Sequence, residues 1–77
     1  MDMDNIYVRF LPLPHRVNGV TVMDENADYN VYLNARLDGY RSRKAYLHEL
    51  EHIRSGHFWR SLSAWSAEIG VELQSLV

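Results

Sequence analysis

The chain has 77 residues, of which 47% are hydrophobic and 23% are charged, and it contains four glycines and two prolines. We expect one small domain over residues 1–77, because this composition excludes a disordered tail, a collagen-like repeat and a low-complexity linker. The net charge of −2 gives no electrostatic reason to expect nucleic acid or an anionic membrane as a partner. The lack of cysteine excludes disulfides and thiolate metal sites, so a stabilising metal would need histidine and carboxylate ligands.

The sequence carries no signal for a membrane or for secretion. No apolar stretch approaches the roughly 18 residues of a membrane-spanning helix. The N-terminal residues 1–5 are acidic and do not resemble a signal peptide. We therefore expect a soluble cytoplasmic protein.

The first half of the chain predicts three strands. The runs Ile6–Leu11, Val20–Met23 and Tyr29–Asn34 are rich in β-branched and aromatic residues, and Pro12 ends the first of them. The polar segment Asp24–Asp28 joins the second and third runs, which predicts an antiparallel hairpin. These elements indicate a small, mostly antiparallel three-stranded sheet.

The second half predicts two helices. Asp38 suits an N-cap and Gly56 suits a C-terminal left-handed cap, so the first helix should run from about residue 40 to 55. A second helix is expected from about Trp59 to the end of the chain, on apolar residues at three- and four-residue spacing: Trp59, Leu62, Trp65, Ile69, Leu73 and Leu76. The predicted fold class is therefore α+β, a sheet followed by two helices that cover it.

The first predicted helix carries the motif H-E-x-x-H at residues 48–52. Residues four apart lie on one face of a helix, so His48 and His52 can converge on one Zn²⁺. Glu49 lies beside that position, where it can accept a proton from a metal-activated water, as in zinc peptidases. Ala45, one turn before Glu49, leaves space beside the cluster. The alternative is a polar helix face on which Glu49 and Glu51 form charge pairs along the helix.

A catalytic zinc ion needs a third protein ligand, and three residues are candidates. His57 follows His52 by five residues, whereas the longer metzincin motif needs six. Glu68 and Glu72 lie one turn apart on the second predicted helix, and the direction of its apolar face slightly favours Glu72. From the residues alone the choice between His57, Glu68 and Glu72 stays open.

The chain resembles the ImmA/IrrE family of metallo-endopeptidases over roughly residues 29–73. The resemblance lies in an apolar strand that ends in Asn34, a short polar linker at residues 35–39, and the helix that carries H-E-x-x-H. The Gly56–His57 pair after the motif is also similar to family members. The family resemblance favours Glu68, three residues before Val71, as the third zinc ligand.

The resemblance implies a minimal zincin-like domain of the gluzincin type. His48, His52 and Glu68 would bind Zn²⁺, and Glu49 would be the general base of a zinc-dependent endopeptidase. The implied substrate is a polypeptide of the transcriptional-repressor kind, encoded in a phage or another mobile element. No residue is assigned by the family pattern to stabilise the oxyanion, for which Tyr40, Tyr46 and His57 are candidates by proximity.

Two other functions fit the sequence. A non-catalytic protein-interaction module stapled by a metal would use His57 or Glu72 as a fourth ligand, since a small domain gains much from a structural ion. A metal-free interaction protein would use the aromatic side chains of Phe58 and Trp59, either at a cleft or in a homodimer contact, whereas Trp65 is expected in the core.

Overall fold

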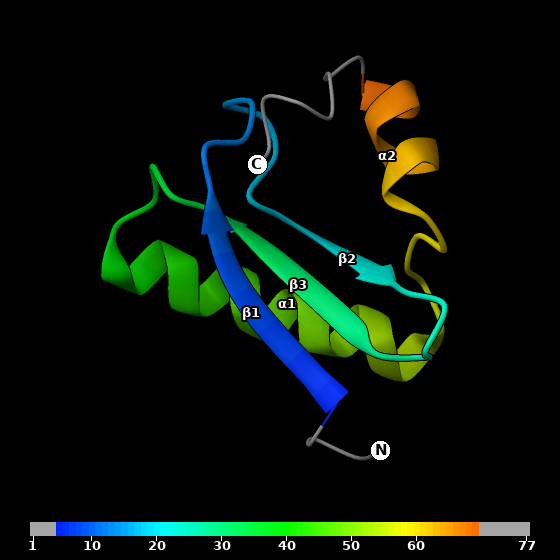
Figure 1. The fold of residues 1–77 in the computed structure, drawn as a ribbon. Helices are drawn as coiled ribbons and strands as arrows, with labels where there is room; N and C mark the ends of the chain where they lie inside the picture. Colours follow the sequence, from blue (N-terminus) through cyan, green and yellow to red (C-terminus); the bar gives the residue numbers. More distant parts are fainter. Residues whose placement is uncertain (1–4, 70–77) are drawn as a thin grey trace.

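The computed structural model describes residues 5–69 and has a three-stranded sheet followed by two helices (Figure 1). The elements follow in the order β1 (Ile6–Leu11), β2 (Gly19–Met23), β3 (Tyr29–Asn34), α1 (Gly39–Ser55) and α2 (Leu62–Ile69). β3 is the central strand; β2 pairs with it antiparallel and β1 pairs with it parallel. The α+β class and the β2–β3 hairpin are confirmed, and the sheet is mixed because one of its two strand pairs is parallel.

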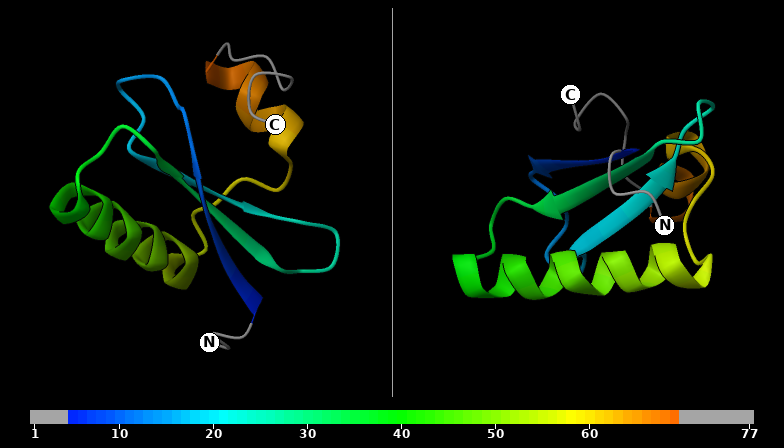
Figure 2. Two further views of the ribbon diagram at one scale, coloured as in Figure 1. Left: turned by 60° about the vertical axis from the view of Figure 1, so that its left-hand side comes forward. Right: turned by 90° about the horizontal axis from the view of Figure 1, so that it is seen from below.

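The two faces of the sheet carry separate hydrophobic clusters. Successive side chains of a strand point to opposite faces, and the register pairs Val20 with Tyr32 and Thr21 with Val31. The α1 cluster consists of the buried residues Val31, Leu33, Ala45 and Ile53. The α2 cluster consists of the buried residues Leu13, Val20, Val22 and Trp65. The helices therefore cover opposite faces, as the left-hand view in Figure 2 shows.

The ends of α1 are fixed by its capping residues. The Asp38 side chain accepts a hydrogen bond of 2.8 Å from the backbone N–H of Arg41. Gly56 adopts the left-handed conformation with φ 76°, and its backbone N–H bonds the last turn. Both predicted caps are confirmed, and α1 keeps its motif in mid-helix.

The segment between the helices differs from the prediction. Trp59 does not begin a helix; it forms a parallel bridge with Val22 at the outer edge of β2. Its N–H donates to the Thr21 carbonyl at 3.0 Å, and its carbonyl accepts from the Met23 N–H at 2.8 Å. The chain thereby passes round the β2 edge from the α1 face to the other face, where α2 packs. Periodicity could not reveal this, because Trp59 is apolar at a spacing that also fits a helix.

The predicted core role of Trp65 is confirmed, since this side chain is buried against the sheet. The part of the second helix expected beyond residue 69 lies outside the described residues. Within residues 5–69, neither helix has the length and apolar character that crossing a membrane requires.

Asn34, at the end of β3, organises the loop that leads into β2. It is almost fully buried, and its amide donates to the carbonyls of Leu13, Pro14 and Val17 at 2.9–3.1 Å. Its side-chain oxygen accepts from the backbone N–H of Arg36 at 3.1 Å. One buried amide thus satisfies three carbonyl groups of this loop, and it places the start of β2.

Asp24 organises the hairpin turn between β2 and β3. Its carboxylate accepts from the backbone N–H groups of Asp28 at 3.0 Å and Asn26 at 2.9 Å, and from the Asn30 amide at 3.1 Å. These hydrogen bonds, led by the one from Asp28, lower the pKa of Asp24 below its ordinary value of 3.8. The turn therefore favours the charged carboxylate.

Replacing Asp24 with Ala should lower the melting temperature at neutral pH, because the turn loses its acceptor. A lowered pKa stabilises the fold above the unfolded-state value of 3.8, and this contribution disappears as the pH falls through the folded-state pKa. The difference in melting temperature between the two proteins should therefore shrink below about pH 4. Thermal unfolding of both proteins from pH 7 to pH 3, followed by circular dichroism, tests this; a difference that does not change with pH would contradict it.

Candidate metal centre

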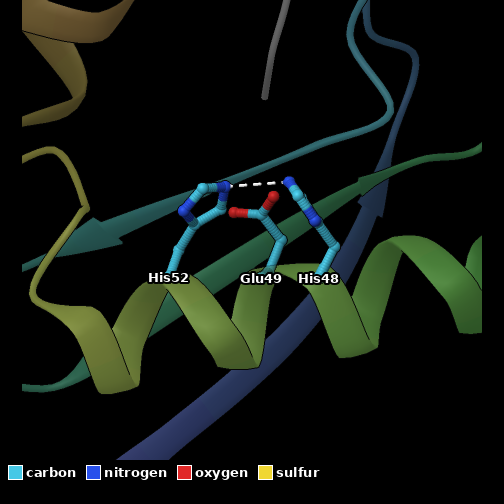
Figure 3. A group of neighbouring side chains, drawn as sticks. All are labelled: His48, Glu49 and His52. Carbon is cyan, nitrogen blue, oxygen red and sulfur yellow. Dashed lines mark hydrogen bonds between the residues drawn. The ribbon is translucent and has the colours of Figure 1, made fainter.

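His48 and His52 meet above the middle of α1 (Figure 3). Their Nε2 atoms are 2.9 Å apart, and the ring planes are nearly perpendicular at 85°. The predicted four-residue spacing therefore brings the two imidazoles together on one helix face. His48 is exposed and His52 is half-buried, so both rings border solvent.

Glu49, on the same helix, lies between the two histidines (Figure 3). Ligand atoms of His48, Glu49 and His52 all lie within 4.8 Å of one another. The Glu49 side chain is 6% exposed, and its Oε1 accepts a hydrogen bond of 2.9 Å from the hydroxyl of Thr21, which is 2% exposed. The buried carboxylate is thus held by a side chain of β2 while it faces the two imidazoles.

Gly19 allows α1 to approach β2 this closely. A methyl group at its Cα would lie 3.2 Å from Cγ of Glu49 and 3.1 Å from Cδ2 of Leu33. Both distances are shorter than ordinary van der Waals contact, so any side chain here would push against Glu49 or Leu33. Absence of a side chain at this position lets the carboxylate lie over the strand.

A cleft of about 570 Å³ lies between α1 and the start of β2. Ala45 is nearly buried and lines this cleft, as its small side chain predicts. The residues that line the cleft are Asn18, Gly19, Tyr40, Arg41, Lys44, Ala45, His48, Glu49 and His52. The group of three side chains therefore opens into a space that a ligand can enter.

The two glutamates of the motif have different environments. Glu51 is exposed and forms an ion pair with Arg54, which lowers the pKa of Glu51 through a hydrogen bond. Glu49 forms no such pair among residues 5–69 and is buried against Thr21. The alternative of two surface glutamates in charge pairs therefore describes Glu51 and does not describe Glu49.

The structure does not bring Glu68 to the two histidines. Glu68 is exposed on α2, which packs on the opposite face of the sheet, and it is not in the group of three. His57 lies just beyond α1, with its ring centroid 6.3 Å from that of His52, and is also outside the group. Glu72 lies outside the described residues. A third ligand besides the two histidines stays a prediction.

The donor set nevertheless suits a metal ion. Two imidazoles and a carboxylate are ordinary Zn²⁺ ligands, and tetrahedral coordination at about 2.0–2.1 Å places two ligand nitrogens about 3.3–3.4 Å apart. The observed 2.9 Å between the histidine nitrogens needs only a small opening of the pair. The group can therefore hold a metal ion, whose identity the geometry leaves open.

The three side chains predicted as candidates for stabilising an oxyanion do not lie together in the structure. Tyr40 lines the cleft and is 74% exposed. Tyr46 lines a different groove, beside Phe10 of β1, and His57 is exposed outside the cleft. Only Tyr40 is thus placed beside the group of three.

No protein-family profile, curated protein or solved structure matches this chain.

Thr21 is the residue of the site that the sequence did not indicate. It lies in a short apolar strand, 28 positions before its partner Glu49, and no local pattern links the two. A single threonine in a strand is an ordinary strand residue, so only the packing of α1 on β2 shows its role.

Replacing Thr21 with Val should destabilise the fold by about 1–3 kcal/mol, because the buried Glu49 carboxylate loses its hydrogen-bond donor. Thr21→Ser keeps the hydroxyl and should recover much of that loss. Urea unfolding of the three proteins measures the difference. Equal stability of the Val variant and the parent protein would show that the hydrogen bond contributes nothing.

Proposed function

We propose that this chain is a minimal zinc-dependent endopeptidase whose active site is the group of His48, Glu49 and His52. The observation that carries this proposal is the convergence of two imidazoles and a buried carboxylate at an open cleft. Metal, acid–base group and space for a substrate are the parts that metal-assisted peptide hydrolysis requires.

The two histidines are the metal ligands in this proposal. Their Nε2 atoms lie 2.9 Å apart, at a hydrogen-bond distance. When the proton of each neutral ring is on Nδ1, both Nε2 lone pairs are available to a metal ion. A Zn²⁺ ion bound there supplies Lewis acidity that polarises a peptide carbonyl and lowers the pKa of water. Glu68 is the third ligand by resemblance, which requires α2 to lie differently from the arrangement described above.

Glu49 is the general base. Its Oε1 is occupied by the Thr21 hydroxyl, so the carboxylate has one fixed orientation. The other oxygen is left to take a proton from the attacking water and to deliver it to the leaving amine. Burial beside two imidazoles supports this role better than a role as a surface charge.

A peptide substrate would lie along the outer edge of β2. The backbone groups of Thr21 and Met23 point away from β3, because they bond Trp59 on that side. By the alternation of an antiparallel pair, the backbone of Gly19 points the same way, and Gly19 lines the cleft. An extended polypeptide can therefore add to this end of the strand and pass the histidines.

The resemblance to the ImmA/IrrE metallo-endopeptidases agrees with this proposal. It favours a protein substrate of the transcriptional-repressor kind and a phage or mobile-element setting. The buried Asn34 at the end of β3, one of the residues that carries the resemblance, positions the loop before β2 and hence one wall of the cleft.

The second candidate function is a non-catalytic protein-interaction module that the same bound metal ion stabilises. The observation that favours it is the size of the core: among the described residues, each face of the sheet has four buried hydrophobic residues in its cluster. A domain with so little buried apolar surface gains stability from a bound ion. The two functions differ in whether Glu49 has any catalytic effect.

Metal binding is tested by elemental analysis of the purified protein. We expect about one zinc ion per chain, lost in His48→Ala and in His52→Ala because each removes a ligand. Zinc should remain in Glu49→Gln if this residue acts as a base, and should be lost if Glu49 is itself a ligand. Glu51→Gln is the matched control and should keep its zinc.

The same measurement on Glu68→Ala identifies the third ligand. Loss of zinc would assign this role to Glu68, and retention would transfer it to another residue. Full zinc content in both histidine variants would contradict the proposed site.

Catalysis is tested with a library of unstructured peptides and detection of cleavage products by mass spectrometry. Glu49→Gln should reduce the cleavage rate by about 10²–10⁴-fold, the usual contribution of a general base, while Glu51→Gln should cleave at the parental rate. Zinc binding without any cleavage by the parent protein would instead support the metal-stapled module.

A further inference from the structure

The cleft beside the two histidines has a basic wall. Arg41 lines it two turns, and Lys44 one turn, closer to the N-terminus of α1 than His48. Residues separated by three, four or seven positions share one helix face, so both cations lie on the face that carries the histidines. Both residues are exposed, and the Lys44 ammonium lies 5.9 Å from the centre of the Tyr40 ring.

Within the part of the chain that the structure describes, no salt bridge neutralises these two positive charges. Among residues 5–69 the one salt bridge joins Arg54 and Glu51, so neither Arg41 nor Lys44 has a carboxylate partner there. Of the described residues that line the cleft, Glu49 is the one acidic residue, and it is buried against Thr21. This side of the cleft therefore carries a local positive charge, although the net charge of the whole chain is −2.

The position of these cations does not stabilise α1. The N-terminal end of a helix carries a partial positive charge, which disfavours Arg and Lys and favours Asp and Glu. The first turn of α1 contains Arg41 and no acidic residue, and Lys44 lies in the second turn. The acidic N-cap, Asp38, accepts a hydrogen bond from the backbone N–H of Arg41 and not from its guanidinium. The charges of Arg41 and Lys44 are better matched by an anionic group that enters the cleft.

We propose that Arg41 and Lys44 select acidic polypeptides, by binding an Asp or Glu side chain of the chain that lies in the cleft. This inference rests on the proposed function and names its substrate class. The planar guanidinium of Arg41 suits a carboxylate in a two-bond arrangement, and Lys44 adds a second positive charge.

The spacing fixes where the acidic residue should lie. Four residues of helix rise about 6 Å, and an extended peptide advances about 3.3 Å per residue. Lys44 and Arg41 therefore face peptide positions about two and three residues from the one beside His48. Acidic residues should be enriched at those positions on one side of the cleaved bond.

Binding is measured on the zinc-loaded Glu49→Gln protein, which should cleave its ligand about 10²–10⁴-fold more slowly than the parent protein. The probes are a fluorescein-labelled dodecapeptide that contains Asp and Glu and its counterpart with Asn and Gln. By fluorescence anisotropy the acidic peptide should bind at least about tenfold more tightly, and added salt should reduce this preference because exposed charges are screened.

The test variant is Arg41→Gln/Lys44→Gln, and the matched control is Arg43→Gln/Arg60→Gln. The control removes the same charge from residues that line other grooves of the surface. The test variant should lose the preference for the acidic peptide, and the control should keep it within about twofold. Equal affinity for both peptides, or equal loss in both variants, would overturn the proposal.

The peptide library separates this proposal from the proposed function. Cleavage by the parent protein without enrichment of Asp or Glu overturns the acidic substrate class and leaves the endopeptidase intact. Lack of both zinc and cleavage overturns the endopeptidase, and with it the claim that acidic peptides bound at the basic wall are substrates.

Discussion

The contact between Glu49 and the first half of β2 fixes how α1 lies on the sheet. A carboxylate is costly to bury, and it stays buried here because the Thr21 hydroxyl bonds it and because Gly19 leaves room for its methylene groups. The same contact determines the rotation of α1 about its axis. Because the Glu49 side chain is directed toward β2, His48 and His52 lie on either side of it, beside the cleft.

The arrangement of the helices follows from how the chain leaves α1. Gly56 ends the helix, and Trp59 then pairs with the outer edge of β2 before α2 packs on the other face. Because α2 lies on that face, the histidines remain open to solvent on the α1 side. Within residues 5–69 the wall of the cleft is built from α1, Asn18 and the start of β2, and the cations Arg41 and Lys44 are exposed there.

Local patterns in the sequence predicted most of the elements. Asp38 and Gly56 bound α1 through backbone hydrogen bonds within a few residues, so their effect can be read without the rest of the fold. The H-E-x-x-H spacing likewise gives the meeting of His48 and His52, because the helix repeat alone brings them together. The parallel pairing of β1 with β3 and the bridge of Trp59 to β2 connect distant segments, and no local pattern encodes them.

The sequence by itself determined the three strands, the first helix with its caps, and the pair of imidazoles, since all of these depend on backbone geometry over a few residues. Only the tertiary structure decided that Glu49 is buried, that Thr21 holds it and that Glu68 lies on the other face of the sheet. These features depend on which faces of the sheet the helices cover. The helices are placed by the packing of apolar side chains that are far apart in the chain. Because the hydrophobic effect is non-directional, an apolar residue in the sequence does not indicate which residue it will contact.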